Sequence, residues 1–186
     1  MKRAPFVAWL LFLAACAKPP ALPDVPVPPA LAPPPIISPF GVRNDGEHYG
    51  IDIRVPIGTP VLAAAPGTVL WTGDGEISGK AIILQHHERL ATFYFHLSKI
   101  SVRKGMEMAR GQVIGLSGQT GNATTPHVHF GVCRARNAEC RRKLPHGWVN
   151  PVETWLDLER PCFYLSRIEN SSSPDRLTYP VPCRAA

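Results

Sequence analysis

The sequence has little helical periodicity and no apolar run long enough for a membrane helix. Helix-like spacing of apolar residues is scarce before the segment 152–158, so strands are favoured over helices. The apolar stretch from Phe6 to Ala15 is too short to span a bilayer comfortably, which takes about 20 residues. The chain also lacks a base-stacking motif, and we therefore expect no nucleic-acid partner.

Short apolar runs separated by glycines and turns fill residues 58–132. Runs such as 68–71, 81–84 and 92–95 have the length and composition of strands. We therefore predict an all-β domain of antiparallel strands folded into two facing sheets, with the functional site in a groove on one of them. His86 and His87 fall at an expected hairpin turn, and we predict that they, like His146, are surface residues.

The amino end has the features of an export signal. Lys2 and Arg3 precede the apolar stretch, and Leu13-Ala14-Ala15-Cys16 supplies the small residues of a cleavage site. These four residues resemble a bacterial lipobox, which implies that Cys16 is lipidated and becomes the mature amino terminus. Ala17 after it resembles lipoproteins of the outer membrane in a Gram-negative host. We expect a lipid-anchored cell-envelope protein at the periplasmic face of that membrane; the alternative is an ordinary secretory signal that leaves a soluble protein.

Proline dominates the next segment. Many of the 21 prolines lie between Ala17 and Pro35, and such a run should be extended, near polyproline II at about 3.1 Å per residue. We interpret it as a semi-rigid tether, the alternative being a ligand for a proline-binding module. The predicted organisation is a signal peptide at 1–15, the lipidated cysteine and tether at 16–35, one domain at 36–158 and a disulfide-stapled C-terminal extension at 159–186.

Four cysteines remain after Cys16, namely Cys133, Cys140, Cys162 and Cys183. An even number in an exported chain indicates disulfides, although the sequence allows three pairings. Adjacent pairing is the simplest: Cys133 with Cys140 closes a basic excursion, and Cys162 with Cys183 staples the C-terminal extension. The spacings are unlike those of zinc ribbons, so we do not expect these cysteines to bind metal.

Four histidines and one aspartate, spread over three short segments, are candidates for a metal site. The segments contribute His48 with Asp52, His96, and His127 with His129. Alternate side chains of a strand share a face, so His127 and His129 should look into one site. His48 and Asp52 are four apart and can lie on one side of a strand or of a helical turn. Imidazole nitrogens and carboxylate oxygens suit zinc, and three protein ligands leave a fourth position for water. We predict a catalytic centre with one Zn²⁺.

The three pieces, with glycine-rich strands between them, resemble the LytM-type zinc peptidases of peptidoglycan, also called the lysostaphin or M23 family. The resemblance covers roughly residues 38–155 and includes Ser38-Pro39-Phe40-Gly41, the run 94–130 and Val149-Asn150-Pro151. It implies that the zinc ligands are His48, Asp52 and His129. By the same resemblance His96 and His127 flank the bound water and the scissile carbonyl. His127 is our candidate general base and His96 our candidate oxyanion donor, and the two roles can be exchanged.

Two positions depart from the family pattern. Gly131 stands where many members carry an acidic residue, which puts the support of the ligands in doubt, and Asn122-Ala123-Thr124-Thr125 replaces a Ser-Thr-Gly loop, which alters the cleft wall. Neither change removes a predicted ligand.

The net charge is positive and unevenly distributed. The formal charge of +6 includes Lys2 and Arg3, so the chain without these two cations carries +4. Positive residues gather on the excursion that starts at Cys133, at Arg134, Arg136, Arg141, Arg142 and Lys143. Such a patch attracts polyanions, and peptidoglycan stem peptides and anionic lipid headgroups are its candidate partners. A merely solubilising charge is the alternative.

The resemblance implies a zinc endopeptidase that cleaves peptide crosslinks of peptidoglycan, with a membrane leaflet as a second partner through the lipid anchor. Some relatives that lack the ligands activate cell-wall amidases by protein contact, so a non-enzymatic regulator is the alternative. A secreted protein as the substrate is a third possibility. Retention of the aspartate and all four histidines favours the enzyme. The bond cleaved, the oligomeric state and any divisome or amidase partner are not specified by the sequence.

Overall fold

The computed structural model describes residues 31–44, 46–141, 146–155 and 176–185. The predicted signal peptide, Cys16 and Cys162 lie outside the described residues, as do Arg142 and Lys143 of the basic patch. The described residues contain no α-helix, and their only helical segments are two 3-10 turns, η1 (Arg136–Arg141) and η2 (Pro151–Thr154). None of their helices is long and apolar enough to cross a membrane.

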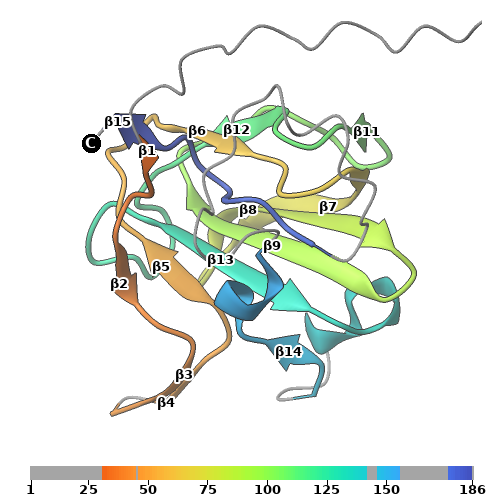
Figure 1. Cartoon of the computed structure of the whole chain (residues 1–186), viewed down its shortest axis with the longest axis horizontal. Helices are drawn as coiled ribbons and strands as arrows, with labels where there is room; N and C mark the ends of the chain where they lie inside the picture. Colours follow the sequence, from red (N-terminus) through yellow and green to blue (C-terminus); the bar gives the residue numbers. More distant parts are fainter. Residues whose placement is uncertain (1–30, 45, 142–145, 156–175, 186) are drawn as a thin grey trace, which may run out of the picture.

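A large antiparallel sheet forms the centre of the molecule (Figure 1). Its strands are, in spatial order, β11 (Glu107–Met108), β7 (Gly67–Gly75), β8 (Gly79–His87), β9 (Leu90–Leu97), β13 (Val128–Cys133), β5 (Ile51–Ile53) and β2 (Ile36–Ser38). A short strand, β14 (Trp148–Val149), pairs with the carboxyl end of β13. These strands coincide with the apolar runs of the sequence, since β-branched and aromatic side chains pack well on a pleated surface.

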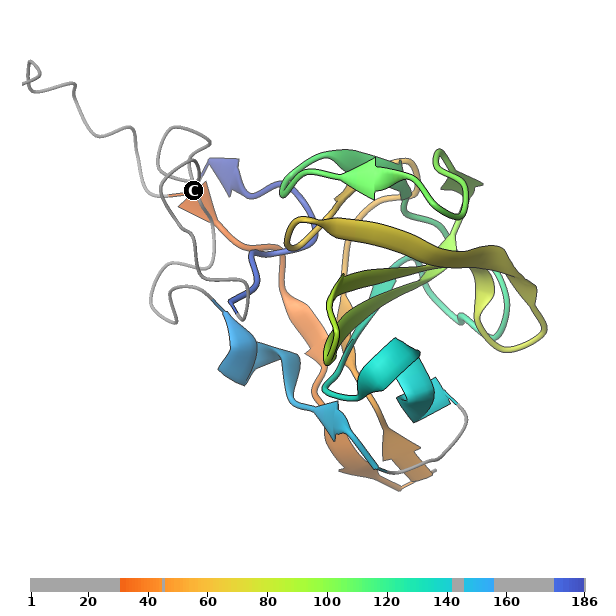
Figure 2. The same cartoon turned by 90° about the vertical axis from the view of Figure 1, so that its right-hand side faces the viewer.

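A smaller sheet covers one face of the large one (Figure 2). It consists of β10 (Lys99–Ile100), β12 (Val113–Leu116) and β6 (Pro60–Leu62), in that order. The principal core lies between the two sheets, where Val61 and Ile114 meet Ile82, Tyr94 and Phe130, all of them fully buried. The predicted class, an all-β domain of two facing antiparallel sheets, is confirmed.

The opposite face of the large sheet carries a second, smaller apolar cluster built around Ile83 and Phe93. The chain after β13 folds back over part of this face, and the predicted disulfide between Cys133 and Cys140 is present there. Cys183 is also disulfide-bonded, and its predicted partner lies outside the described residues. This face, away from the principal core, is the one that carries the candidate site.

Both ends of the described chain belong to the folded body. Strand β1 (Leu31–Ala32) pairs with β15 (Arg184–Ala185), as Figure 1 shows. Leu177, Tyr179 and Val181 are buried in the principal core, and the Tyr179 hydroxyl donates to the Pro34 carbonyl at 2.6 Å. Residues 31–35 and 176–185, taken from the sequence as parts of a tether and an extension, therefore pack on the domain.

Candidate metal centre

Strand pairing brings Asp52 and His129 together. On β13, Val128 and Phe130 point into the principal core, so the alternate side chains of His127 and His129 face the other side of the sheet. Strand β5 pairs antiparallel with β13, and Asp52 lies directly opposite His129. The sequence spacing therefore predicts the face of β13 correctly, and the register of β5 adds the carboxylate.

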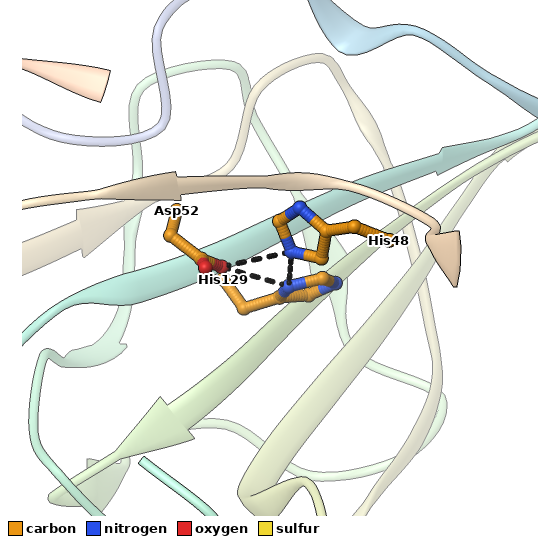
Figure 3. A group of neighbouring side chains, drawn as sticks. All are labelled: His48, Asp52 and His129. Carbon is orange, nitrogen blue, oxygen red and sulfur yellow. Dashed lines mark hydrogen bonds and ion pairs between the residues drawn. The ribbon is translucent and has the colours of Figure 1, made fainter. Parts of the chain in front are cut away.

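His48 reaches the same point from a separate hairpin. This hairpin joins β3 (Gly41–Arg43) to β4 (Gly46–His48) and projects beside the large sheet (Figure 1). The His48 Nε2 atom lies 3.1 Å from Asp52 Oδ1 and 3.0 Å from His129 Nδ1, and these last two atoms are 3.0 Å apart. Figure 3 shows the three side chains converging from β4, β5 and β13.

The proton positions favour a cation between these three atoms. The Pro39 carbonyl can only accept a hydrogen bond, so His48 donates its Nδ1–H to it at 2.7 Å. A neutral His48 therefore directs the Nε2 lone pair at the Asp52 carboxylate and at His129, where lone pair would face lone pair unless a proton or a metal ion intervenes. Ligand atoms at about 2.0–2.1 Å from a tetrahedral zinc stand about 3.3 Å apart. The three atoms here are 3.0–3.1 Å apart, so two imidazoles and one carboxylate fit that ion after a small outward shift.

Arg43 was not singled out from the sequence, yet it holds the carboxylate. Its guanidinium Nη2 donates to Asp52 Oδ2 at 2.9 Å, which leaves Oδ1 directed at the two histidines. Burial acts to raise the pKa of Asp52, but its interactions with the neighbouring His129 and His48 rings outweigh it and hold this pKa well below its usual range. Asp52 is thus ionised, and its second oxygen is already engaged by Arg43. The position of Arg43 on a hairpin strand, nine residues before Asp52, gives no sequence signal of this contact.

His96 enters the site through a break in the strand. Tyr94, two residues earlier on β9, points into the principal core, and regular alternation would send His96 the same way. The register between β8 and β9 shifts between the pairs Ile82–Tyr94 and Lys80–Leu97, and His96 has a φ of 63°. A bulge of this kind re-aims a side chain, and here it turns His96 toward His127, with the ring centroids 4.7 Å apart.

His96 and His127 each present one unprotonated ring nitrogen. His96 Nδ1 donates to the Thr120 carbonyl at 2.8 Å, and His127 Nδ1 donates to the Thr125 carbonyl at 2.7 Å. In the neutral rings the Nε2 lone pairs are therefore free to accept a proton. Burial lowers the pKa of His96 to about 4, which keeps this ring neutral at neutral pH. The His127 Nε2 atom lies 3.7 Å from Asp52 Oδ1, so a proton acceptor stands beside the candidate ligands.

Close packing fixes the ring of His129. Phe95 stacks on one side of it, with centroids 5.2 Å apart and planes 11° from parallel. Burial lowers the pKa of His129, although the hydrogen bond that Asp52 accepts from it acts in the opposite direction. Gly50 also leaves the room that this ring requires, because a Cβ there would lie 2.6 Å from His129 Nε2. A glycine at position 50 therefore permits the close approach of the backbone to the His129 ring.

Gly131, the departure from the family pattern, has a steric reason as well. A Cβ at this position would lie 2.8 Å from the Trp148 ring and 3.0 Å from the Tyr49 carbonyl oxygen. Trp148 stacks on Tyr49, with centroids 5.8 Å apart, and also contacts Phe93. The Trp148 ring and the Tyr49 backbone therefore occupy the space that a longer side chain at position 131 would need.

The other histidines lie away from the centre. His146 is exposed, as predicted. The prediction for His86 and His87 as surface residues is wrong, because both are half-buried at the end of β8. His86 Nδ1 donates to the Pro66 carbonyl at 2.9 Å, and its Nε2 lies 2.7 Å from the Thr92 hydroxyl.

Two histidines, a carboxylate and two neighbouring imidazoles on one sheet face define the site of a metallopeptidase-like β domain. Residues 46–140, half of the chain, match Peptidase family M23, and the chain belongs to this family. It is 47% identical over 88 residues to the peptidoglycan DD-endopeptidase ShyA of Vibrio cholerae serotype O1, a match that covers 47% of this chain and 20% of that protein. The chain thus spans only a fifth of that relative.

Solved structures show the same fold. The catalytic domain of lysostaphin from Staphylococcus simulans superposes with a TM-score of 0.55 at 32% identity, over 66% of this chain and 90% of that one. A zinc-containing peptidase from Vibrio cholerae superposes with a TM-score of 0.54 at 36% identity, over 59% of this chain and 36% of the other. The described strands are therefore those of an M23 catalytic domain.

Proposed function

We propose that this protein is a zinc-dependent endopeptidase that hydrolyses peptide crosslinks of bacterial peptidoglycan. The observation that carries the proposal is the convergence of His48 Nε2, Asp52 Oδ1 and His129 Nδ1 within 3.1 Å of one another. The names of the relatives add support, since they include a peptidoglycan DD-endopeptidase and a glycyl-glycine endopeptidase of Staphylococcus capitis. His48, Asp52 and His129 would hold one Zn²⁺.

Zinc, when bound, lowers the pKa of its water from about 15.7 toward about 7 and polarises the scissile carbonyl. His127 is placed to take the proton of that water, because its Nε2 is unprotonated and 3.7 Å from a ligand oxygen. The resulting imidazolium can return the proton to the leaving amine. His96 has the same tautomer, so it can donate to a developing oxyanion only after gaining a proton. In the free protein its pKa is lowered to about 4, so the ring is neutral and can equally act as a hydrogen-bond acceptor.

The cellular setting follows from the sequence alone and is part of the proposal. We propose that residues 1–15 are a signal peptide and that Cys16 carries the lipid anchor at the periplasmic face of the outer membrane. The tether would then run from 16 toward 35, and its last residues lie on the domain. Labelling with a radioactive fatty acid tests the anchor. Label in the wild type and none in Cys16→Ala is the expected result; equal label in both would exclude lipidation at this residue.

A non-enzymatic regulator of cell-wall amidases is the alternative. It shares the fold and requires no turnover, so family membership alone does not separate the two functions. The complete set of donors and neighbouring imidazoles favours the enzyme, because a protein that acts by contact alone has no need of them.

A digestion experiment tests the proposal. The chain from Ala17 onward, which keeps residues 31–35, is loaded with zinc and incubated with crosslinked peptidoglycan, beside a chelated sample and the His129→Ala variant. Mass spectrometry should show loss of crosslinked dimers and new free stem peptides with the wild type only. No cleavage by folded, zinc-loaded protein, together with stimulation of an added amidase, would favour the regulator instead.

A further inference from the structure

A pocket of about 670 Å³ is lined by residues that are close in sequence to Asp52 and His127. Its walls are largely apolar and come from Pro34, Pro35, Val55, Thr125 and Pro126, with one charged side chain, Arg54. None of these residues belongs to the metal centre described above, so the pocket is a separate feature.

Two connections place the pocket beside the reacting groups. Arg54 follows Asp52 by two residues, just after the end of β5. Its neighbours Ile53 and Val55 are buried in the principal core and Arg54 is exposed, so its side chain lies on the side away from that core, as does that of Asp52. Thr125 and Pro126 directly precede His127, and the Thr125 carbonyl accepts the His127 Nδ1–H at 2.7 Å. A peptide bound with its scissile bond at the metal centre would therefore pass into this pocket on one side.

The walls of the pocket are held in place by the rest of the fold. The Pro34 carbonyl accepts from the Tyr179 hydroxyl at 2.6 Å, and the Pro35 carbonyl accepts from the Arg54 backbone N–H at 3.0 Å. Prolines have fixed φ angles and lose little side-chain entropy on binding. The N-terminal segment thus forms a preorganised wall opposite Thr125 and Pro126.

Among the described residues that line the pocket, Arg54 is the only charged one. Its side chain is exposed, and within the described part of the chain no hydrogen bond or ion pair engages its guanidinium. An arginine on an apolar wall suits a carboxylate, which it can bind through two parallel N–H donors.

We propose that this pocket is a substrate subsite in which Arg54 binds the free carboxylate of an acidic peptide residue next to the scissile bond. The inference rests on the proposed function and adds a substrate preference to it. Crosslinked stem peptides with a free carboxylate at that residue are then better substrates than the same peptides with a carboxamide.

The test uses two synthetic crosslinked peptides that differ only in this carboxylate or carboxamide. For the zinc-loaded wild type we expect kcat/KM to be about tenfold higher with the carboxylate, the size of one charge-assisted hydrogen bond. Arg54→Gln should remove the preference by lowering kcat/KM for the carboxylate peptide alone, and Arg54→Lys should retain part of it. Arg103→Gln is the matched control, since Arg103 is exposed between β10 and β11, and β11 is at the far edge of the large sheet from β5.

Binding separates this inference from the proposed function. Calorimetry measures binding to the subsite without turnover. It uses a free tripeptide that is not cleaved and that carries this residue in its acid or its amide form. If the acid tripeptide binds in an Arg54-dependent way but the crosslinked peptides are not cleaved, the subsite is supported and the endopeptidase is overturned. Cleavage and binding that are equal for both peptides, or unchanged in Arg54→Gln, would overturn the subsite and leave the endopeptidase standing. If neither peptide binds or is cleaved, both fail.

Discussion

Two histidines on neighbouring strands, His86 on β8 and His96 on β9, have the same lowered pKa of about 4 and different surroundings. Burial is the main cause of the lowered pKa in both. His86 has both ring nitrogens within hydrogen-bond distance of protein oxygens, at Pro66 and Thr92. His96 uses Nδ1 on the Thr120 carbonyl and keeps Nε2 on the side of the metal centre. A perturbed pKa alone therefore does not distinguish a structural histidine from a functional one.

The difference lies in what the second nitrogen meets. The Thr92 hydroxyl that meets His86 is also 2.9 Å from the Tyr94 hydroxyl, which accepts from the Ala64 N–H. The polar groups of this series, from His86 through Thr92 and Tyr94 to Ala64, are thus hydrogen-bonded to one another. At the metal centre the unprotonated nitrogens of His48, His96 and His127 face a shared space. Open lone pairs gathered in one place are what a metal ion and a water molecule require.

The largest effect should come from removing a ligand. His129→Ala takes away one of three donors and should abolish both zinc binding and turnover, because two donors hold zinc far more weakly than three. Elemental analysis of purified protein and the peptidoglycan digestion measure the two effects. His86→Gln, the comparison variant, should keep one zinc per chain and wild-type turnover. Equimolar zinc in His129→Ala would remove this residue from the ligand set.

Removing a proton acceptor should lower turnover and leave the metal in place. His127→Ala should reduce kcat by about 10²- to 10⁴-fold, the usual contribution of a general base, with zinc content unchanged. His96→Ala should also retain zinc, and the two kcat values rank the residues as proton acceptors. Zinc loss in His127→Ala to the level of His129→Ala would show that the separation between ligands and helpers is wrong.

The sequence predicts the sheet face on which His127 and His129 lie better than it predicts the contacts that position the other site residues. The strand alternation of His127 and His129 depends on local periodicity, which a sequence displays, and β13 follows it. The turn of His96 away from the core depends on a bulge between β8 and β9, and the bond from Arg43 to Asp52 depends on how a hairpin packs on β5. Both features depend on tertiary packing, which leaves no periodic pattern in the sequence.

The fold shows the same division. Apolar runs predicted the long strands, but the placement of Leu177 and Tyr179 in the principal core could not be read from a segment separated from that core by many residues. The same limit explains the error at His86. A position next to a turn indicates exposure, whereas the contacts with Pro66 and Thr92 come from a neighbouring loop and strand.

The lowered pKa of His86 should appear in the pH dependence of stability. The unfolded chain binds a proton on this histidine below about pH 6.5 and the folded chain only below about pH 4, so the unfolding free energy should fall as pH drops from 6.5 to 4. We expect at most about 3 kcal/mol from this group. Urea unfolding of metal-free protein should show a smaller fall in His86→Gln than in the wild type. The exposed-site control His146→Gln should match the wild type, and identical curves for all three would exclude a role for His86.

The smallest predicted effect concerns the backbone at His96. A residue with a side chain at φ 63° costs roughly 1 kcal/mol relative to glycine in that conformation, so His96→Gly should be more stable to urea than His96→Ala by about that amount. At Thr72, in the regular part of β7, the order should reverse, because glycine weakens an ordinary strand. Both His96 variants should lose turnover equally, since both lack the imidazole. If glycine is the less stable residue at both positions, the left-handed backbone of His96 is not a source of strain, and the bulge that aims this side chain at the metal centre costs the fold nothing measurable.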